Sequence, residues 1–191
     1  MSSQPIPRIT PEEYLRRERV AEFRSEFIDG QVFAMAGGTM NHARIIGNAL
    51  GNLRERLRGT GCEVFSGELR VWSEPHRIYT YPDVVAACRP YQFQDATRDT
   101  ITDAALVIEV PSRSTANYDR GEKFRFYRSL PSFSEYLLLA QDTIRAEHHV
   151  RQPDGGWLFH ERTSPDDGID LKVTGCRIPL SSFYESVEFE G

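Results

Sequence analysis

Two acidic residues adjoin runs of apolar residues with strand-like composition. Asp83 directly precedes Val84–Cys88, and Glu109 lies near the end of Ala104–Val110. A carboxylate without a partner in so apolar a strand is energetically costly or takes up a proton. An arginine partner or a strand end in solvent would satisfy Glu109, and a turn cap would account for Asp83. If the two strands are neighbours, the carboxylates can instead hold one hard divalent cation, such as Mg²⁺, for a phosphate substrate.

Lysine is rare in this chain, and one lysine follows these acids. Of the 23 basic residues only Lys123 and Lys172 are lysines. Lys123 lies on a predicted helix after Glu109, with Asp119 one turn before it, and an exposed Lys123–Asp119 pair would contribute only about half a kcal/mol. A compact ammonium can orient a water molecule or contact one phosphate oxygen, whereas guanidinium is a wide fork. The use of lysine here favours a chemical role.

The histidines are weaker candidates. His42 stands at the start of the longest predicted helix, and we interpret it as nearer structural than catalytic. His148, His149 and His160 lack the spacing and the carboxylate partners of a zinc site.

The elements that must position these residues alternate between helices and strands. Thr10 and Pro11 are typical of a helix N-terminus, and Asp29-Gly30 is typical of a type I′ hairpin turn. Ala104–Val110 is expected to be a buried central strand because apolar residues occupy both of its faces. Helices are predicted at 11–19, 41–58 and 119–130, and strands at 26–28, 31–35, 63–65, 69–72, 78–81, 84–88, 104–110, 135–139, 147–151, 157–162 and 169–173. This order favours a mixed α/β sheet flanked by helices.

Length and composition indicate an ordinary globular protein. One domain covering residues 1–191 is expected, with 39% hydrophobic and 27% charged residues. No run is long enough to cross a membrane and no secretory signal is recognisable, so we expect a soluble, cytoplasmic protein. Cys62, Cys88 and Cys176 are odd in number and widely spaced, which predicts three buried cysteines without a disulfide or a thiolate metal site. A net charge of −5 disfavours a protein that coats nucleic acid, but not a nuclease with carboxylates at its centre.

Several segments form a specific combination. They are Tyr81-Pro82-Asp83, Leu106 to Thr115 and Tyr118 to Tyr127, together with Tyr14-Leu15, Glu26 to Val32, His42 to Ile45 and Pro131 to Leu139. Over nearly the whole chain this combination resembles the "Putative restriction endonuclease" family of the Uma-two type. That family belongs to the PD-(D/E)XK nuclease superfamily and was long catalogued as a domain of unknown function.

The resemblance implies a restriction-endonuclease-like fold and a metal-dependent endonuclease that hydrolyses phosphodiester bonds, with DNA as the expected substrate. Asp83, Glu109 and the Val110 carbonyl are the expected ligands of Mg²⁺ or Mn²⁺, and Lys123 is the base-like residue. Glu26 resembles an acidic residue that completes some sites of the superfamily, although an arginine partner across the hairpin would account for it equally. The strict motif has lysine two residues after the glutamate, where this chain has Pro111, so Lys123 has to replace it.

Two other classes of function remain open. The same fold could serve as a binding or partner module without turnover, which the acidic composition and Pro111 both allow. A glycoside hydrolase would use Glu26, Asp83 and Glu109 as paired carboxylates, but Trp72 and Trp157 flank nothing recognisable as a sugar platform. Symmetric cutting of both DNA strands would favour a two-fold homodimer. No membrane partner is expected.

Overall fold

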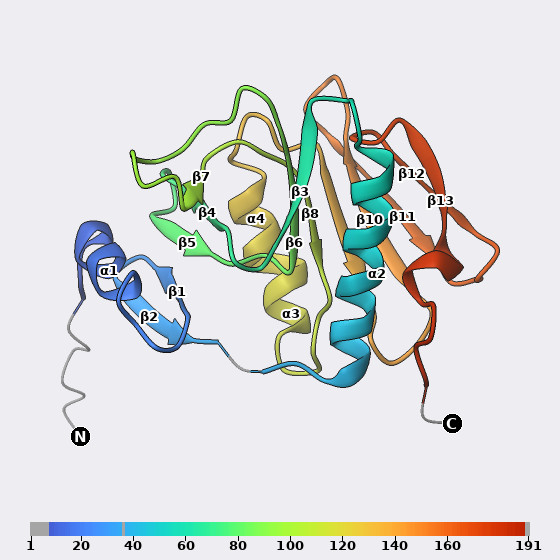
Figure 1. Cartoon of the computed structure of the whole chain (residues 1–191), viewed down its shortest axis with the longest axis horizontal. Helices are drawn as coiled ribbons and strands as arrows, with labels where there is room; N and C mark the ends of the chain where they lie inside the picture. The colour runs from blue at the N-terminus through green and yellow to red at the C-terminus, as the bar shows by residue number, and fades with distance from the viewer. Residues whose placement is uncertain (1–7, 36, 190–191) are drawn as a thin grey trace.

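A six-stranded mixed sheet lies at the centre of the structure (Figure 1). The computed structural model describes residues 8–35 and 37–189, so both ends of the predicted domain, residues 1–191, lie outside the described residues. Strands β8 and β9 are parallel, and the other neighbouring strands of the sheet are antiparallel. The strand order is β11-β10-β9-β8-β6-β3, with β3 at Cys62–Ser66, β6 at Val84–Cys88, β8 at Ala104–Glu109, β9 at Glu135–Leu139, β10 at Ala146–Arg151 and β11 at Trp157–Arg162. The mixed α/β class and the central position of β8 are confirmed.

The long helix α2 (Met40–Arg56) covers one face of this sheet (Figure 1). Its N-terminus is capped by Thr39, whose hydroxyl accepts the His42 N–H at 3.1 Å and satisfies a free helix donor. One apolar stripe of the helix packs against side chains of β6 and β8 that point to the same face. The buried residues of the stripe are Ile45, Ala49 and Leu53, and those of the two strands are Val84, Ala86, Leu106 and Ile108.

A second helical segment, Ala116–Tyr127, covers the opposite face. It consists of α3 (Ala116–Tyr118), a π-helical turn η1 (Asp119–Lys123) and α4 (Phe124–Tyr127), and it lies behind the sheet in Figure 1. It begins three residues before the predicted helix 119–130 and ends three residues before that prediction does. Tyr127 packs here with the alternate residues of the central strands, such as Val85 and Val107.

The N-terminal part of the chain forms a second sheet beside the first (Figure 1). The predicted hairpin is confirmed, and its turn residues Asp29 and Gly30 have φ of 42° and 90°. The predicted first helix is also confirmed as α1 (Pro11–Glu18), capped by the Thr10 hydroxyl. The strand order is β2-β1-β5-β4-β7, with β1 at Ser25–Ile28, β2 at Gln31–Ala34, β4 at Arg70–Ser73, β5 at Ile78–Thr80 and β7 at Thr100–Ile101.

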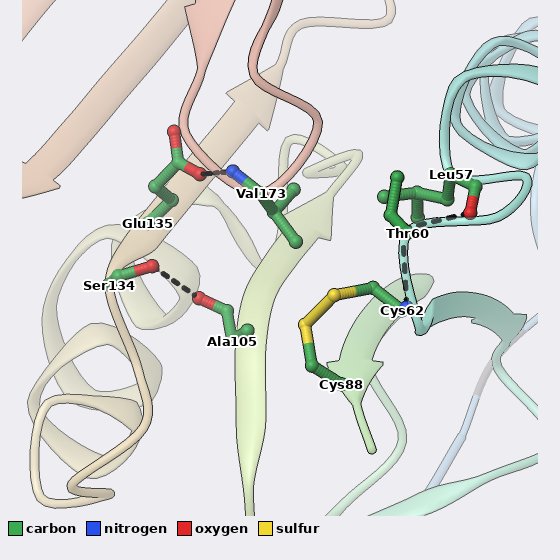
Figure 2. Close-up of a disulfide and its surroundings, with 8 residues drawn as sticks. All are labelled: Leu57, Thr60, Cys62, Cys88, Ala105, Ser134, Glu135 and Val173. Carbon is green, nitrogen blue, oxygen red and sulfur yellow. Dashed lines mark hydrogen bonds between the residues drawn. A yellow bond between two sulfur atoms is a disulfide. The ribbon is translucent and has the colours of Figure 1, made fainter.

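A C-terminal hairpin packs onto the same side of the sheet as α2. It pairs β12 (Gly168–Leu171) with β13 (Cys176–Pro179), followed by the 3-10 helix η2 (Leu180–Phe183). Only the first of these strands is predicted by the sequence. Glu135 on β9 anchors the hairpin, because its fully buried carboxylate accepts the backbone N–H groups of Lys172 and Val173 at 2.9 Å. Figure 2 shows the bond from Val173.

The cysteine prediction is wrong, because Cys62 and Cys88 form a disulfide (Figure 2). The antiparallel register of β3 and β6 places the two residues directly opposite each other, and a sequence separation of 26 residues gives no sign of this pairing. Cys176, expected to be buried, is a free and exposed cysteine. Thr60 orders the approach to the disulfide, since its hydroxyl accepts the Cys62 N–H and donates to the Leu57 carbonyl.

Removal of this disulfide should destabilise the protein. The bond closes a loop across 26 residues of sequence separation, for which the loss of chain entropy in the unfolded state corresponds to about 3 kcal/mol. We expect the Cys62→Ala/Cys88→Ala variant to lose about that much unfolding free energy in urea titrations. Cys176→Ala is the matched control and should unfold like the parent. Equal stability of the oxidised parent and the double variant would contradict the prediction.

Within the described ranges, none of the helices has the length and apolar character needed to cross a membrane.

Candidate active site

Asp83 and Glu109 lie side by side at one end of the central sheet. Because β6 and β8 are antiparallel, with Val84 opposite Ile108, the start of β6 meets the end of β8. Asp83 Oδ2 accepts the Val110 N–H at 2.7 Å, and the Asp83 N–H in turn donates to Glu109 Oε2 at 3.2 Å. These reciprocal hydrogen bonds hold the two carboxylates in a fixed relation.

Lys123 places its amine against Glu109 despite a separation of 14 residues. Its Nζ lies 3.2 Å from Glu109 Oε1, 3.3 Å from Glu26 Oε1 and 3.4 Å from Asp119 Oδ1. Only 8% of the Lys123 surface is exposed, so this is not the exposed helix pair considered from the sequence. Tyr127 also donates its hydroxyl to Glu109 Oε1 at 3.0 Å.

The π-helical turn η1 explains how this helix turns so many functional groups toward the sheet. In a regular α-helix, residues four apart are rotated by about 40° relative to one another. A π turn is wider and rotates them in the opposite sense, so the two deviations compensate along the segment. Asp119, Lys123 and Tyr127 therefore share one buried face.

Glu26 enters the same cluster from the N-terminal hairpin. Its carboxylate contacts the Lys123 amine and accepts the Tyr81 N–H at 3.4 Å. Glu26 is 9% exposed and its ion pair is with a lysine, not with the arginine considered as an alternative. The hairpin thus supplies a carboxylate to a site otherwise built by the central sheet and its helices.

His42 is part of the cluster, although we interpreted it from the sequence as nearer structural. Its Nδ1 lies 3.0 Å from the Val110 carbonyl oxygen, and its Nε2 lies 3.5 Å from Asp83 Oδ1. A Cβ atom at Gly38 would lie 2.4 Å from the imidazole, so glycine is needed there to admit the ring. The available signal was the position of His42 in the first turn of a helix that follows Gly37-Gly38.

These residues line a cavity of about 560 Å³, which we call the carboxylate cavity. Four carboxylates face two basic side chains in it, so an added cation would relieve repulsion among the acids. Phe33 and Met35 of the hairpin segment form part of its apolar rim. The charged lining residues are Glu26, Asp83, Glu109, Asp119, His42 and Lys123.

Burial and charge shift the protonation of the central groups. Burial raises the pKa of Glu109 well above its usual range, against the opposing effect of the Lys123 ammonium. Burial by itself lowers the pKa of Lys123, but the carboxylates of Glu109, Glu26 and Asp119 outweigh it, and the pKa of Lys123 is raised well above its ordinary value. The hydrogen bond with Asp83 raises the pKa of His42. Lys123 is therefore held as an ammonium cation.

The oxygen atoms at this end of the sheet fit a hard divalent cation. Besides the paired carboxylates of Asp83 and Glu109, the Val110 carbonyl oxygen faces the same imidazole that contacts Asp83. Across residues 8–35 and 37–189 no group of three or more His, Cys, Asp or Glu side chains is arranged to hold a metal ion. Mg²⁺ takes one or two protein carboxylates and retains several waters, and the Asp83–Glu109 pair has this number of carboxylates.

The other histidines and the two tryptophans considered from the sequence do not line the carboxylate cavity. His148 pairs with Glu135 inside the fold, with 3.1 Å between Nε2 and Oε1. Trp72 stacks on Tyr79 in the N-terminal core, and Trp157 packs against Phe133, so neither tryptophan lines the site as a sugar-binding platform would.

Residues 11–181 match the model of the family described as "Putative restriction endonuclease" (Uma2). The chain belongs to this family. Two uncharacterized proteins of Synechocystis sp. are similar over most of their length. One is 37% identical over 163 residues, which covers 85% of this chain and 92% of that protein. The other is 34% identical over 187 residues, which covers 98% of this chain and 97% of that protein.

The fold of this Uma2 protein also has a solved counterpart. The crystal structure of a protein from Anabaena variabilis, described as a putative nuclease belonging to DUF820, matches with a TM-score of 0.71. The match covers 93% of this chain and 98% of that chain at 14% identity, so it concerns the fold alone. The predicted restriction-endonuclease-like fold class is confirmed.

Proposed function

We propose that this protein is a metal-dependent endonuclease that hydrolyses phosphodiester bonds in DNA. The observation that carries the proposal is the interlocked pair of Asp83 and Glu109, with the Lys123 amine 3.2 Å from Glu109 Oε1 inside one cavity. Membership of the family described as "Putative restriction endonuclease" supports a nuclease reaction. Symmetric cleavage of duplex DNA would be served by a two-fold homodimer.

Asp83, Glu109 and the Val110 carbonyl would hold Mg²⁺ or Mn²⁺ at the sheet end. A divalent cation in such a site acts as a Lewis acid toward the phosphate and lowers the pKa of bound water. Two backbone N–H groups keep the carboxylates in place. The Asp83 N–H donates to the Glu109 carboxylate, and the Val110 N–H donates to the Asp83 carboxylate. This preorganisation avoids rearrangement during the reaction.

Lys123 would orient the attacking water or neutralise charge on the phosphate. The raised pKa of Lys123 keeps the amine protonated, which suits a hydrogen-bond donor and a cation. Glu26 and Asp119 hold this ammonium in place, because each carboxylate is buried and lies within 3.4 Å of Nζ. They act as positioning residues for Lys123.

Metal dependence tests the proposal directly. Supercoiled plasmid should be nicked in the presence of Mg²⁺ or Mn²⁺, and EDTA should abolish nicking, because the carboxylates alone supply no Lewis acid. Calorimetric titration with Mn²⁺ should detect binding to the parent protein. A chain that binds metal but cuts neither DNA nor RNA, or that binds no metal, would contradict the proposal and support a partner module without turnover.

A further inference from the structure

A second cavity adjoins the carboxylate cavity and is rich in arginine. Its volume is about 950 Å³, and four arginines contribute to its lining. Thr39, Ser112 and Gln141 line both cavities, so the two are contiguous. We call it the arginine cavity, after Arg44, Arg113, Arg120 and Arg145.

The same elements that build the acidic site also direct these arginines. Near the start of α2, His42 lines the carboxylate cavity and Arg44 lines the arginine cavity, because residues two apart on a helix point in nearly opposite directions. After β8, Ser112 lies on the rim between the cavities and Arg113 lines only the arginine cavity. A chain of anionic groups could therefore pass continuously from one cavity to the other.

The arginines differ in how fully their charge is neutralised. The charge of Arg120 is neutralised by Glu147, to which its guanidinium donates three hydrogen bonds of 2.7–2.9 Å. Arg145 is held loosely, with 3.8 Å from Nη2 to Glu147 and 4.0 Å from Nη1 to Glu161. Its buried Nε has no hydrogen-bond acceptor in the part of the chain that the structure describes. An unsatisfied donor of this kind is costly. The long contacts of Nη1 and Nη2 leave these partly exposed groups of Arg145 with bonding capacity for a ligand.

Arg44 and Arg113 are also available. Among the residues that the structure describes, Arg44 forms one ion pair, with the carboxylate of Glu188 at 3.4 Å, and the Glu188 side chain is 83% exposed. Arg113 is exposed and makes no ion pair within residues 8–35 and 37–189. Exposed ion pairs contribute little to stability, so a phosphate group can readily replace the carboxylate partner. Three guanidinium groups thus face the arginine cavity with weak or no internal partners.

We propose that Arg44, Arg113 and Arg145 form a subsite for the backbone phosphates of a nucleic acid, next to the phosphodiester that enters the carboxylate cavity. This inference rests on the proposed function, which places the reacting phosphodiester beside the cation that Asp83 and Glu109 would hold. Guanidinium forks match phosphate oxygens in geometry and charge. Such a subsite would let a chain of net charge −5 bind a polyanion locally, although Asp142, Glu147 and Glu188 also line this cavity, because the guanidinium groups of the three arginines are only weakly neutralised.

Binding without cleavage tests the subsite. The affinity of the full chain for a fluorescent duplex oligonucleotide should be measured by anisotropy in EDTA at several salt concentrations. We expect Arg113→Ala and Arg145→Ala each to weaken binding and to reduce the slope of log K against log[salt] by about 1. Arg58→Ala is the matched control, because Arg58 is exposed just beyond the other end of α2. It should bind like the parent.

The outcomes separate this inference from the function on which it rests. Parental affinity and slope in an Arg113→Ala/Arg145→Ala variant, or no binding by the parent chain, would overturn the subsite. Displacement of the oligonucleotide by millimolar inorganic phosphate at constant ionic strength would indicate a free-phosphate site and would also overturn it. Arginine-dependent binding without cleavage in any metal would overturn the nuclease reaction alone, whereas cleavage with arginine-independent binding would overturn the subsite alone.

Discussion

Glu109→Gln should lose metal-dependent cleavage by about a thousandfold or more while the protein stays folded. The amide keeps the volume of the side chain, and its single oxygen can still accept the hydrogen bond from Tyr127, although the Asp83 N–H, which donates to the other oxygen of Glu109, then loses its acceptor. The substitution removes the negative charge that would hold the cation, and a metal contribution of several kcal/mol corresponds to this loss of rate. The plasmid-nicking rate and the affinity for Mn²⁺ should therefore fall together.

Two comparisons make this result specific. Glu122→Gln changes an exposed glutamate of the adjacent π-helical turn and should leave nicking and metal affinity unchanged. Asp83→Asn should resemble Glu109→Gln in both measurements, because the two carboxylates form one pair. Full nicking activity in folded Glu109→Gln would remove Glu109 from the proposed site.

Lys123→Arg should fail nearly as badly as Lys123→Ala, with a loss of roughly a hundredfold to ten-thousandfold in nicking rate. The amine is buried among three carboxylate oxygens at 3.2–3.4 Å, and this space suits a compact ammonium. The larger guanidinium retains the charge but cannot put a single donor at the same point.

The unfolding free energies of Lys123→Ala and Lys123→Arg should distinguish the loss of the positive charge from a change in its position. Lys123→Ala leaves Glu26, Glu109 and Asp119 without their shared cation, and such a loss costs about 3–5 kcal/mol. Lys123→Arg retains a cation and should lose less unfolding free energy in urea. Lys172→Arg replaces the other lysine, which is exposed, and should cut at the parental rate. Parental cleavage by Lys123→Arg would show that the chemistry needs only a positive charge.

Much of the local structure follows from short stretches of sequence. The Thr10 cap, the Asp29-Gly30 turn and the apolar stripe of α2 each depend on neighbouring residues, and all three are observed. The burial of β8 is equally local, since its apolar residues occupy both faces. The predicted bounds are less accurate where an element is irregular. The helix predicted at 119–130 is observed at Ala116–Tyr127 and contains a π-helical turn.

The features that sequence reasoning missed join residues that are distant along the chain. His42 meets the Val110 carbonyl across 68 residues, and Cys62 meets Cys88 through the register of β3 and β6. Periodicity indicates which face of an element is buried, but not which element will cover it. The Asp119–Lys123 pair is local in sequence, but its burial beside Glu109 and Glu26 depends on how the helix packs on the sheet.

The sequence by itself determined the chemistry available to this protein: acidic residues at strand ends, a rare lysine on the following helix, and a set of segments typical of one nuclease family. Only the tertiary structure decided the arrangement of these groups. Antiparallel pairing of β6 with β8 brings Asp83 to Glu109, and the π-helical turn directs Lys123 at Glu109. Near the start of α2, neighbouring residues line an acidic cavity and an arginine-lined one. The physical reason is that residue type sets what a side chain can do, whereas strand register and helix packing set what it meets.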